Sequence, residues 1–447
     1  MTALEQLGAY VAGGDAVLPE TRELLRLHVA DSVGAWIAAM PTTEGRALLR
    51  WRATIGSSTA SQNELDDVAI NCGLARLSEI DDIHLASMTT PGGIVIPAAL
   101  TLSRLVPAAP EALAPAIMVG YEVMIRLGLA IGGPTILYRG IWPTYFAAPF
   151  ATAAVAARLL GLDARQSAHA LALALTSASP GVGHHGAATG SRWFAVGRAA
   201  QNGVTAALAA RDGFTSDINI LDGTFLREVY GITLDSSALV DGLGKHHALA
   251  AVSFKPWCAA RQTMAATAAL RQLLDDGLAI DDITEIKVSL PPPQVKMVDH
   301  GVTAGDRASH LTSVPYQMAI AGLNPDAAYD VAQSPSVLPD GVRALMNKIR
   351  IEGDESLLTN YPRVWRARVR VAARGGSRER DISEVPGDPG CAFDADAIKA
   401  KFHRFVEPVL GASMAKMALE NSLCALDHLS ARQALQDALL RVRTELH

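Results

Sequence analysis

The spacing of the apolar residues changes character twice along this chain of 447 residues. Up to about residue 250 the apolar residues recur three and four positions apart, as in segments 21–38 and 112–129, which is typical of helices. After Phe254 apolar and polar residues alternate in short runs, and from Ala397 the helical spacing returns. This return to the first pattern indicates that one domain is inserted into another.

The alternating runs predict half-buried strands, at residues 286–290, 349–351 and 365–371. Arginines at every second position of the last run favour a solvated face over an anion site. We therefore predict a mainly α fold with an α+β insertion. A large all-helical domain comprises residues 1–253 and 393–447, and a smaller α+β domain of antiparallel type comprises residues 254–392.

The composition limits the kinds of partner. Hydrophobic residues make up 49% of the chain and aromatic residues only 5%, so alanine, leucine and valine must build the core, which suits close-packed helices. The net charge is -6 and the pI is about 6.1. Nucleic acid and anionic membranes attract an excess of lysine and arginine, which this chain lacks. We expect neither as a partner.

Several features predict a cytoplasmic protein. Residues 1–16 lack a basic segment followed by an apolar one, so no signal peptide is expected. Four cysteines occur without a paired spacing, which predicts reduced thiols. The uncharged segment 140–157 contains Pro143 and Pro149 and is interpreted as a buried helix with its entry loop rather than a membrane span.

One segment carries groups suited to proton transfer. Asp81, Asp82 and His84 lie within four residues, and a turn signal at 91–93 follows. A carboxylate can orient an imidazole that acts as a general base. The alternative is structural, since paired aspartates commonly cap helices and a neighbouring histidine is often just exposed.

The sequence gives no sign of a cofactor. No glycine-rich phosphate loop is present. His184 and His185, and likewise His246 and His247, are adjacent pairs without the spacing or carboxylate partners of a metal site. We therefore expect neither a metal nor an organic cofactor.

Six blocks in order along the chain resemble the MmgE/PrpD family, which includes 2-methylcitrate dehydratase, cis-aconitate decarboxylase and iminodisuccinate epimerase. The blocks are residues 79–84 with 91–92, 142–144 with 151–162, 192–203 with 213–215, 254–261, 313–316, and 386–402. The resemblance implies a large all-helical domain, a smaller lid domain, a homodimer and no cofactor. It also implies an active site between the domains that acts on small di- or tricarboxylates.

Carried over residue by residue, the resemblance assigns two groups of site residues. The catalytic residues are Asp82, His84, Lys255 and Tyr316, with proton transfer at His84 paired with Asp82 and with Lys255 and Tyr316 across the same pocket. The substrate-binding residues are Asp81, Thr90, Trp142, Thr144, Arg192 and Arg261. The two arginines are expected to grip carboxylates through their planar forks.

The chain departs from the family pattern where the chemistry lies. Ile83, Thr90, Trp142, Arg192 and Ala260 stand at positions where the family carries other residues, several of them histidines. Loss of these imidazoles argues against decarboxylation. We predict an isomerase that resembles iminodisuccinate epimerase, with a lyase that resembles 2-methylcitrate dehydratase as the alternative. A family relative that binds a carboxylate without catalysis is the alternative of another class.

Overall fold

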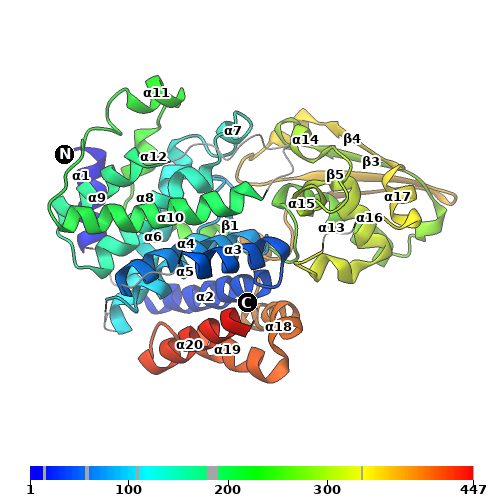
Figure 1. The fold of residues 1–447 in the computed structure, drawn as a ribbon. Coiled ribbons are helices and arrows are strands. Elements are labelled where there is room, and N and C mark those ends of the chain that lie inside the picture. The colour runs from blue at the N-terminus through cyan, green and yellow to red at the C-terminus, as the bar shows by residue number, and fades with distance from the viewer. Residues whose placement is uncertain (14–16, 56–59, 107–109, 179–189, 334–335, 446–447) are drawn as a thin grey trace. The chain divides into compact units, whose positions relative to one another are not determined.

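A computed structural model describes the chain except for residues 14–16, 56–59, 107–109, 179–189, 334–335 and 446–447 (Figure 1). The described residues form two compact units. The helical unit consists of residues 1–178, 191–253 and 394–445, and the mixed unit consists mainly of residues 254–393. The prediction of a mainly α fold with a smaller α+β part is confirmed. His184 and His185 lie outside the described residues.

The first two segments of the helical unit contain most of its helices. These are α1 (Ala3–Gly13), α2 (Pro19–Ala39), α3 (Thr43–Thr54), α4 (Ala60–Leu77), α5 (Gly92–Leu102), α6 (Pro110–Ala130), α7 (Pro134–Leu137), α8 (Pro143–Leu159), α9 (Ala164–Thr176), α10 (Ser191–Arg211), α11 (Phe225–Tyr230) and α12 (Ser236–Val240), followed by the 3₁₀ turn η1 (Ala248–Ala251). Helix α8 packs between α6 and α10, and α4 packs on α10 and α5.

Small residues let these helices approach closely, as the alanine-rich composition predicts. At Gly203 of α10, an added Cβ would lie 2.0 Å from the carbonyl oxygen of Pro149 in α8. Helix α6 is long and apolar enough to cross a membrane, but 83% of its apolar window is buried. Its surface is thus covered by protein, as in the core helix of a globular unit.

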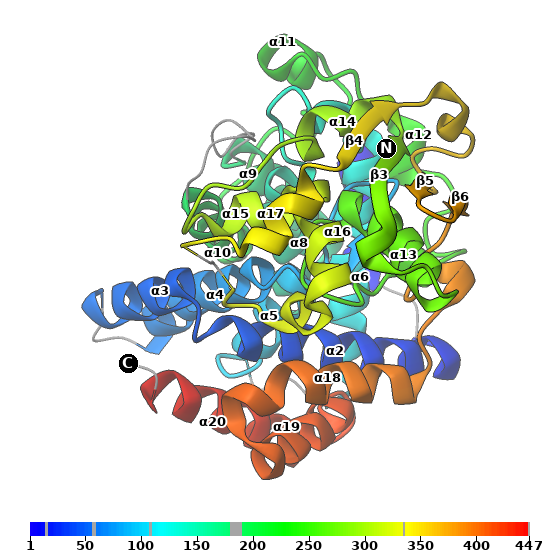
Figure 2. The same ribbon diagram turned by 90° about the vertical axis from the view of Figure 1, so that its right-hand side faces the viewer.

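The third segment returns to α2. Helices α18 (Ala395–Leu410) and α19 (Ala412–Cys424) pack on α2, and α20 (Leu429–Glu445) contacts α5 (Figure 2). Lys401 of α18 forms a buried ion pair with Asp31 of α2, with 2.5 Å between Nζ and Oδ1. Its ammonium also donates to the carbonyl oxygen of Ile80 at 2.7 Å. The last helices therefore reach the segment that carries the aspartate pair.

A short ladder that the periodicity does not predict lies in the same unit. Strand β1 (Ile83–His84) pairs antiparallel with β2 (Val252–Ser253), with Ile83 opposite Ser253 and His84 opposite Val252. Two residues are too few to show an alternating pattern, so the sequence gives no signal for these strands. The ladder holds the backbone of His84 in an extended conformation.

Among its described residues, the mixed unit combines a four-stranded sheet with five helices. Its strands are β3 (Ile283–Leu290), β4 (Ile349–Gly353), β5 (Ala367–Ala373) and β6 (Gly376–Ile382), in the order β4-β3-β5-β6. Its helices are α13 (Arg261–Asp275), α14 (Pro292–Val298), α15 (Arg307–Thr312), α16 (Val314–Leu323) and α17 (Asp340–Met346), with 3₁₀ turns η2 (Ile280–Asp282), η3 (Pro325–Tyr329), η4 (Glu355–Leu358) and η5 (Pro389–Cys391). Helix α13 packs against β5 and β6.

The sheet is mixed, which corrects the prediction of an antiparallel type. Strands β3 and β4 pair in parallel, whereas β3–β5 and β5–β6 are antiparallel. The chain between β3 and β4 contains α14 to α17, and such a long connection permits a parallel return. The arginines of the last predicted strand lie in cross-strand ion pairs with acids, such as Arg370 with Glu379, so the solvated face is confirmed.

Candidate active site

Asp82 lies at the centre of a buried hydrogen-bonded group in the helical unit. One carboxylate oxygen accepts from the backbone N–H of Gly92 at 2.7 Å. The other lies 2.7 Å from both His28 Nδ1 and the Tyr121 hydroxyl, which donates to it. Among the described residues, Asp82 therefore hydrogen-bonds to His28, Tyr121 and Gly92 rather than to His84. The expected pairing of Asp82 with His84 is corrected accordingly.

The two glycines after Pro91 are required by this arrangement. A Cβ on Gly92 would lie 2.6 Å from an oxygen of Asp82, and one on Gly93 would lie 2.7 Å from an oxygen of Asp81. The two carboxylates therefore touch the backbone where α5 begins. A carboxylate at a helix N-terminus is stabilised by the free N–H groups and the helix dipole.

Asp81 belongs to a second group of charges. Its Oδ1 lies 3.1 Å from Arg76 Nη1, and Arg76 Nη2 lies 3.0 Å from Glu79 Oε1. Glu79 adopts a left-handed backbone with φ of 58°, an uncommon conformation for a residue with a side chain. The guanidinium of Arg76 lies 5.6 Å from the ring centroid of Trp193. The negative charge of Asp81 is thus compensated by Arg76. The sequence did not single out Arg76 as a site residue.

The ring of His84 is fixed by Ser87. His84 Nδ1 accepts from the backbone N–H of Ser87 at 3.2 Å and lies 2.9 Å from the Ser87 hydroxyl. A backbone N–H can only donate, so Nδ1 carries the lone pair and the proton of the neutral ring is on Nε2. Burial lowers the pKa of His84 to about 4, although the charge of Asp82 acts to raise it. At neutral pH His84 is therefore a neutral donor through Nε2.

Thr90 and Thr144 connect the His84 segment to α8. The backbone N–H of Thr90 donates to Thr144 Oγ1 at 3.1 Å, and Thr144 Oγ1 donates to the carbonyl oxygen of Met88 at 3.3 Å. Both threonines are buried. The Thr144 hydroxyl thus holds the backbone of Met88 and Thr90, whereas the Thr90 hydroxyl lies 3.4 Å from that of Thr144. The predicted substrate contact of both threonines stays a prediction.

Arg192 lies among aromatic rings instead of acids. Its guanidinium carbon is 5.1 Å from the ring centroid of Trp142 and 5.5 Å from that of Trp193. The residue is only 6% exposed. Within the described part of the chain, it has no hydrogen bond and no ion pair. A buried cation without a carboxylate partner is unusual, because burial of an uncompensated charge is costly.

Two neighbouring polar atoms also lack partners. Trp142 Nε1 and the Tyr145 hydroxyl are buried and have no hydrogen bond among the described residues. The two rings touch edge to face with centroids 5.6 Å apart. Burial raises the pKa of Tyr145 to about 12, whereas the charges of Arg76 and Arg192 act to lower it. Both groups are therefore donors at neutral pH, in the same cluster as the Arg192 cation.

The structure places Lys255 and Arg261 in the mixed unit. Lys255 is buried. Arg261 Nη2 lies 2.5 Å from Asp388 Oδ2, and its guanidinium lies 5.9 Å from the ring centroid of Trp365. Arg261 therefore already pairs with one acid, and its contact with a substrate carboxylate stays a prediction. Two of its nitrogens, Nε and Nη1, remain buried without a partner among the described residues.

Tyr316 lies next to a histidine that the sequence reasoning missed. Its ring meets that of His310 edge to face with centroids 4.9 Å apart. Burial, with a smaller effect from the charge of Asp330, raises the pKa of Tyr316 to about 12. Burial also lowers the pKa of His310. His310 Nε2 is buried without a partner in the described part of the mixed unit.

The predicted residues thus fall into two sets. Asp81, Asp82, His84, Thr90, Trp142, Thr144 and Arg192 belong to the helical unit, and Lys255, Arg261 and Tyr316 belong to the mixed unit. That the two sets act on one substrate stays a prediction. In the ranges that the structure describes, no group of three or more His, Cys, Asp and Glu is arranged to hold a metal ion.

Comparison with known families assigns a class to this fold and site. The MmgE/PrpD N-terminal domain matches residues 5–228, and the MmgE/PrpD C-terminal domain matches residues 257–425. These matches define a two-domain protein of MmgE/PrpD type, in which the C-terminal match includes α18 and α19 of the helical unit.

The chain therefore belongs to the MmgE/PrpD family. Members of this family are generally enzymes, among them dehydratases and isomerases. A search of curated proteins found no match.

Proposed function

We propose that this protein is an enzyme that moves a proton at a carbon next to a carboxylate of a small di- or tricarboxylate. The observation that carries the proposal is Arg192, a buried guanidinium that contacts Trp142 and Trp193 and has no acidic partner among the described residues. A substrate carboxylate would supply the missing negative charge. A planar guanidinium binds a carboxylate through two parallel hydrogen bonds.

The unpartnered donors beside Arg192 support a carboxylate as the ligand. The Trp142 N–H and the Tyr145 O–H are both buried and unsatisfied in the described structure. A carboxylate has about four lone-pair sites and can accept from several donors at once. One bound carboxylate can therefore satisfy the cation and these donors together.

His84 has a different role in this proposal from the one expected. Its neutral Nε2–H can donate to a substrate oxygen, but the lone pair on Nδ1 is already used by Ser87. Proton removal next to a carboxylate builds negative charge on oxygen, and a fixed donor stabilises that charge. A neutral imidazole with a lowered pKa acts in this way in triosephosphate isomerase. We therefore assign His84 as an electrophilic donor instead of the base.

The proton acceptor is then assigned by elimination. With a pKa near 12, Tyr316 is protonated at neutral pH and suits proton donation. This leaves Lys255 as the base among the predicted catalytic residues. If Lys255 removes the proton from one face of the reacting carbon and Tyr316 returns a proton to the other face, the configuration of that carbon is inverted. The same pair would expel a β-hydroxide as water, so dehydration is the alternative reaction.

We infer from the family resemblance that the enzyme works as a homodimer in the cytoplasm, with no nucleic-acid or membrane partner. We also infer that it needs neither metal nor organic cofactor, because the proposed steps use only side-chain donors and acceptors. Activity that is lost with a chelator and restored by a divalent ion would contradict this part. Of the two reactions, we favour an epimerisation that resembles the reaction of iminodisuccinate epimerase over dehydration.

Solvent-deuterium exchange tests the function directly. The protein is incubated anaerobically in heavy water with a panel of small hydroxy-, amino- and imino-dicarboxylates and tricarboxylates. Deuterium at the carbon next to a carboxylate, with inversion of configuration, supports the epimerase. Formation of a conjugated alkene supports the dehydratase. Saturable binding without exchange into any compound would instead indicate a non-catalytic carboxylate-binding relative.

Matched arginine variants test the role of Arg192. Arg192→Gln should weaken substrate binding at least about tenfold, because a charge-assisted bidentate contact is lost. Arg192→Lys should recover only part of the loss, since an ammonium lacks the planar fork. Arg198→Gln on the exposed side of the same helix is the control. Equal affinity of Arg192→Gln and the control would contradict the assignment.

A further inference from the structure

Helix α6 carries a buried ion pair whose two members lie one turn apart. Glu122 Oε1 lies 2.6 Å from Arg126 Nε, and both residues are buried. A buried ion pair adds little net stability, because the cost of removing two charges from water offsets their attraction. The other contacts of the two side chains therefore indicate what the pair does.

The guanidinium of Arg126 binds the end of α12. Its Nη1 donates to the carbonyl oxygens of Leu239 at 3.2 Å and of Asp241 at 3.0 Å. The last carbonyls of a helix have no partner within that helix, so a cation there takes the role of a cap. Arg126 thus fixes the point at which the loop 241–247 begins.

The carboxylate of Glu122 binds the other end of this loop. Its Oε2 accepts from the backbone N–H of Ala248 at 2.9 Å, and Ala248 is the first residue of η1. His247, which precedes η1, provides no capping hydrogen bond from its side chain. The carboxylate of Glu122 supplies that acceptor instead. The ion pair therefore joins the two ends of the loop 241–247.

The turn η1 runs directly into β2, which is the partner of the strand that carries His84. Val252 lies opposite His84 in this ladder. On its other side, the backbone N–H of His84 donates to the carbonyl oxygen of Thr89 at 2.8 Å. The place of the His84 backbone therefore depends on where η1 begins. The residue before Glu122 on α6 is Tyr121, so neighbouring residues of one helix hold Asp82 directly and His84 through β2.

We propose that Glu122 and Arg126 are positioning residues of the proposed reaction, which hold the His84 imidazole in place through η1 and β2. This inference rests on the proposed role of His84 as a donor to the substrate. A displacement of about 1 Å in a catalytic group can lower the rate ~100-fold. Substrate binding is assigned to Arg192 of α10. Loss of the ion pair should therefore lower kcat and leave KM unchanged.

Two variants of Glu122 test this split, on the compound of the deuterium panel that the parent exchanges fastest. Glu122→Ala removes both contacts of the carboxylate, and kcat should fall at least about tenfold. Glu122→Gln keeps an oxygen that can accept from the Ala248 N–H, and kcat should fall only about threefold. In both variants KM should stay within about twofold of the parent value. Parental kcat in Glu122→Ala would refute the proposal.

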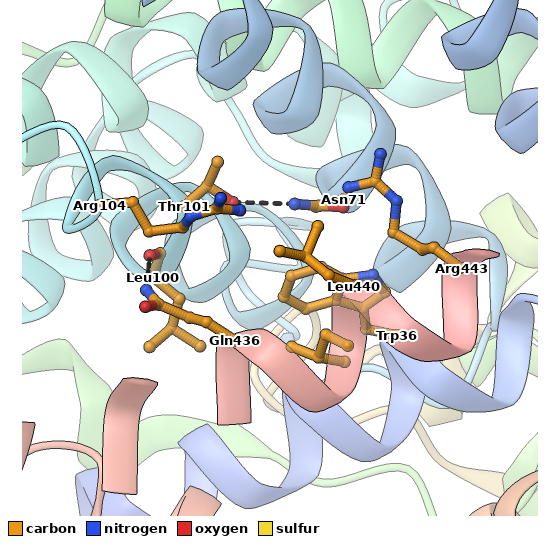
Figure 3. A pocket seen from close by; sticks show the side chains of 9 residues that line it. Trp36, Asn71, Leu100, Thr101, Arg104, Gln436, Leu440 and Arg443 are labelled. Carbon is orange, nitrogen blue, oxygen red and sulfur yellow. Dashed lines mark hydrogen bonds between the residues drawn. The ribbon is translucent and has the colours of Figure 1, made fainter. Parts of the chain in front are cut away.

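Asp67→Ala is the matched control for the loss of a buried acid. Asp67 Oδ1 lies 2.7 Å from Arg52 Nε and 2.9 Å from Arg443 Nη2. Arg443 lines the small pocket between α20, α2, α4 and the end of α5 (Figure 3). Asp67 lies ten residues before the end of α4, which is about 15 Å along the helix. Asp67→Ala should lower the thermal midpoint, as Glu122→Ala does, but should keep the parental kcat. An equal loss of kcat in the two variants would show that lowered stability alone explains it.

A double-variant cycle tests whether the effect passes through His84. In the His84→Asn background there is no imidazole to position, so Glu122→Ala should lower kcat by less than about twofold. The same fold loss in this background as in the parent would contradict the proposal.

NMR of the ligand-free chain separates this inference from the proposed function. The protein is labelled with ¹⁵N in its histidines, and the His84 signals are identified by their absence in His84→Asn. They should move in both Glu122 variants and stay in place in Asp67→Ala. If the parent exchanges no compound of the panel, the proposed function fails, whereas moved His84 signals still support the positioning. His84 signals that stay in place in both Glu122 variants would overturn the inference.

Discussion

His84 illustrates how burial selects between the roles open to one side chain. The residue is 7% exposed, and Nδ1 accepts from the Ser87 backbone N–H. The sequence indicates an imidazole near two carboxylates but not which nitrogen carries the proton, because that depends on a hydrogen bond made by the folded backbone. That a histidine lies near the aspartates was therefore predictable, whereas its tautomer was not.

The lowered pKa of His84 predicts a loss of stability in acid. The folded pKa of about 4 lies below the usual 6.5, so the unfolded chain takes up this proton first as the pH falls. The contribution of His84 is thus fully present above about pH 6.5 and is lost towards pH 4, by up to ~3 kcal/mol. His84→Asn keeps an acceptor for Ser87 and cannot take up the proton.

Thermal unfolding of the parent and of His84→Asn between pH 7.5 and 4.5 checks this prediction. The parent should lose stability relative to the variant as the pH falls. His246→Asn, which changes an exposed histidine, should follow the parent. A constant difference between the parent and His84→Asn across this range would show that His84 titrates normally.

Removal of the Tyr121 hydroxyl should lower the stability of the protein. It donates to Asp82 at 2.7 Å inside the core. Tyr121→Phe should destabilise the protein by about 1–3 kcal/mol, because the buried carboxylate loses one of its donors. Tyr145→Phe is the comparison, since the Tyr145 hydroxyl has no partner among the described residues and its removal should cost little. Equal losses of thermal stability in the two variants would contradict the assignment.

At the scale of elements, the strongest local patterns were reliable. Helix α9 begins with a capping box, in which the Asp163 side chain accepts from the Gln166 N–H at 2.8 Å, and this spacing can be found in the sequence. Strand β3 covers the predicted run at 286–290. Strand β6 was missed because its sequence is polar and most of its residues are exposed, which leaves no alternation to detect. The partners of Asp82 were also missed, since His28 and Tyr121 come from helices distant in sequence and show no local signal.

The close approach of Gly92 to Asp82 at the start of α5 leads to a prediction for this helix. Gly92→Ala would bring a Cβ within 2.6 Å of the Asp82 carboxylate, so the turn and the helix start must move. We expect a loss of about 1–3 kcal/mol in stability and a large loss of exchange activity, because the segment from Asp82 to Gly92 also carries His84. Gly13→Ala in α1, where a Cβ meets nothing within 4 Å, is the control. Circular dichroism melts and the deuterium assay together check the result.

At the scale of the whole molecule, the ion pair between Lys401 and Asp31 joins the two ends of the helical unit. Burial raises the pKa of Asp31, and the charge of Lys401 opposes that effect. Lys401→Met should therefore destabilise the protein by about 3–5 kcal/mol at neutral pH, since it leaves a buried carboxylate without its cation. The double variant with Asp31→Leu should recover much of the loss.

Thermal midpoints of the single and double variants test this coupling. Lys399→Met removes an exposed charge from the same helix and should change little. A double variant that is no more stable than Lys401→Met would show that the loss does not come from the unpaired Asp31. The family domains alone do not predict this contact, because the C-terminal match runs through α18 without marking where that helix packs.

The pairing of residue 401 with residue 31 also sets an order of events during synthesis. When residue 253 has been made, α2 lacks the helices that cover it, and the ribosome must add about 150 more residues before Lys401 exists. At typical rates this takes on the order of 10 to 30 s. The stretch 254–393, which makes up most of the mixed unit, is synthesised within that interval. The part of the chain that is made first is thus the last to finish folding, and until then α2 lacks the helices that cover it.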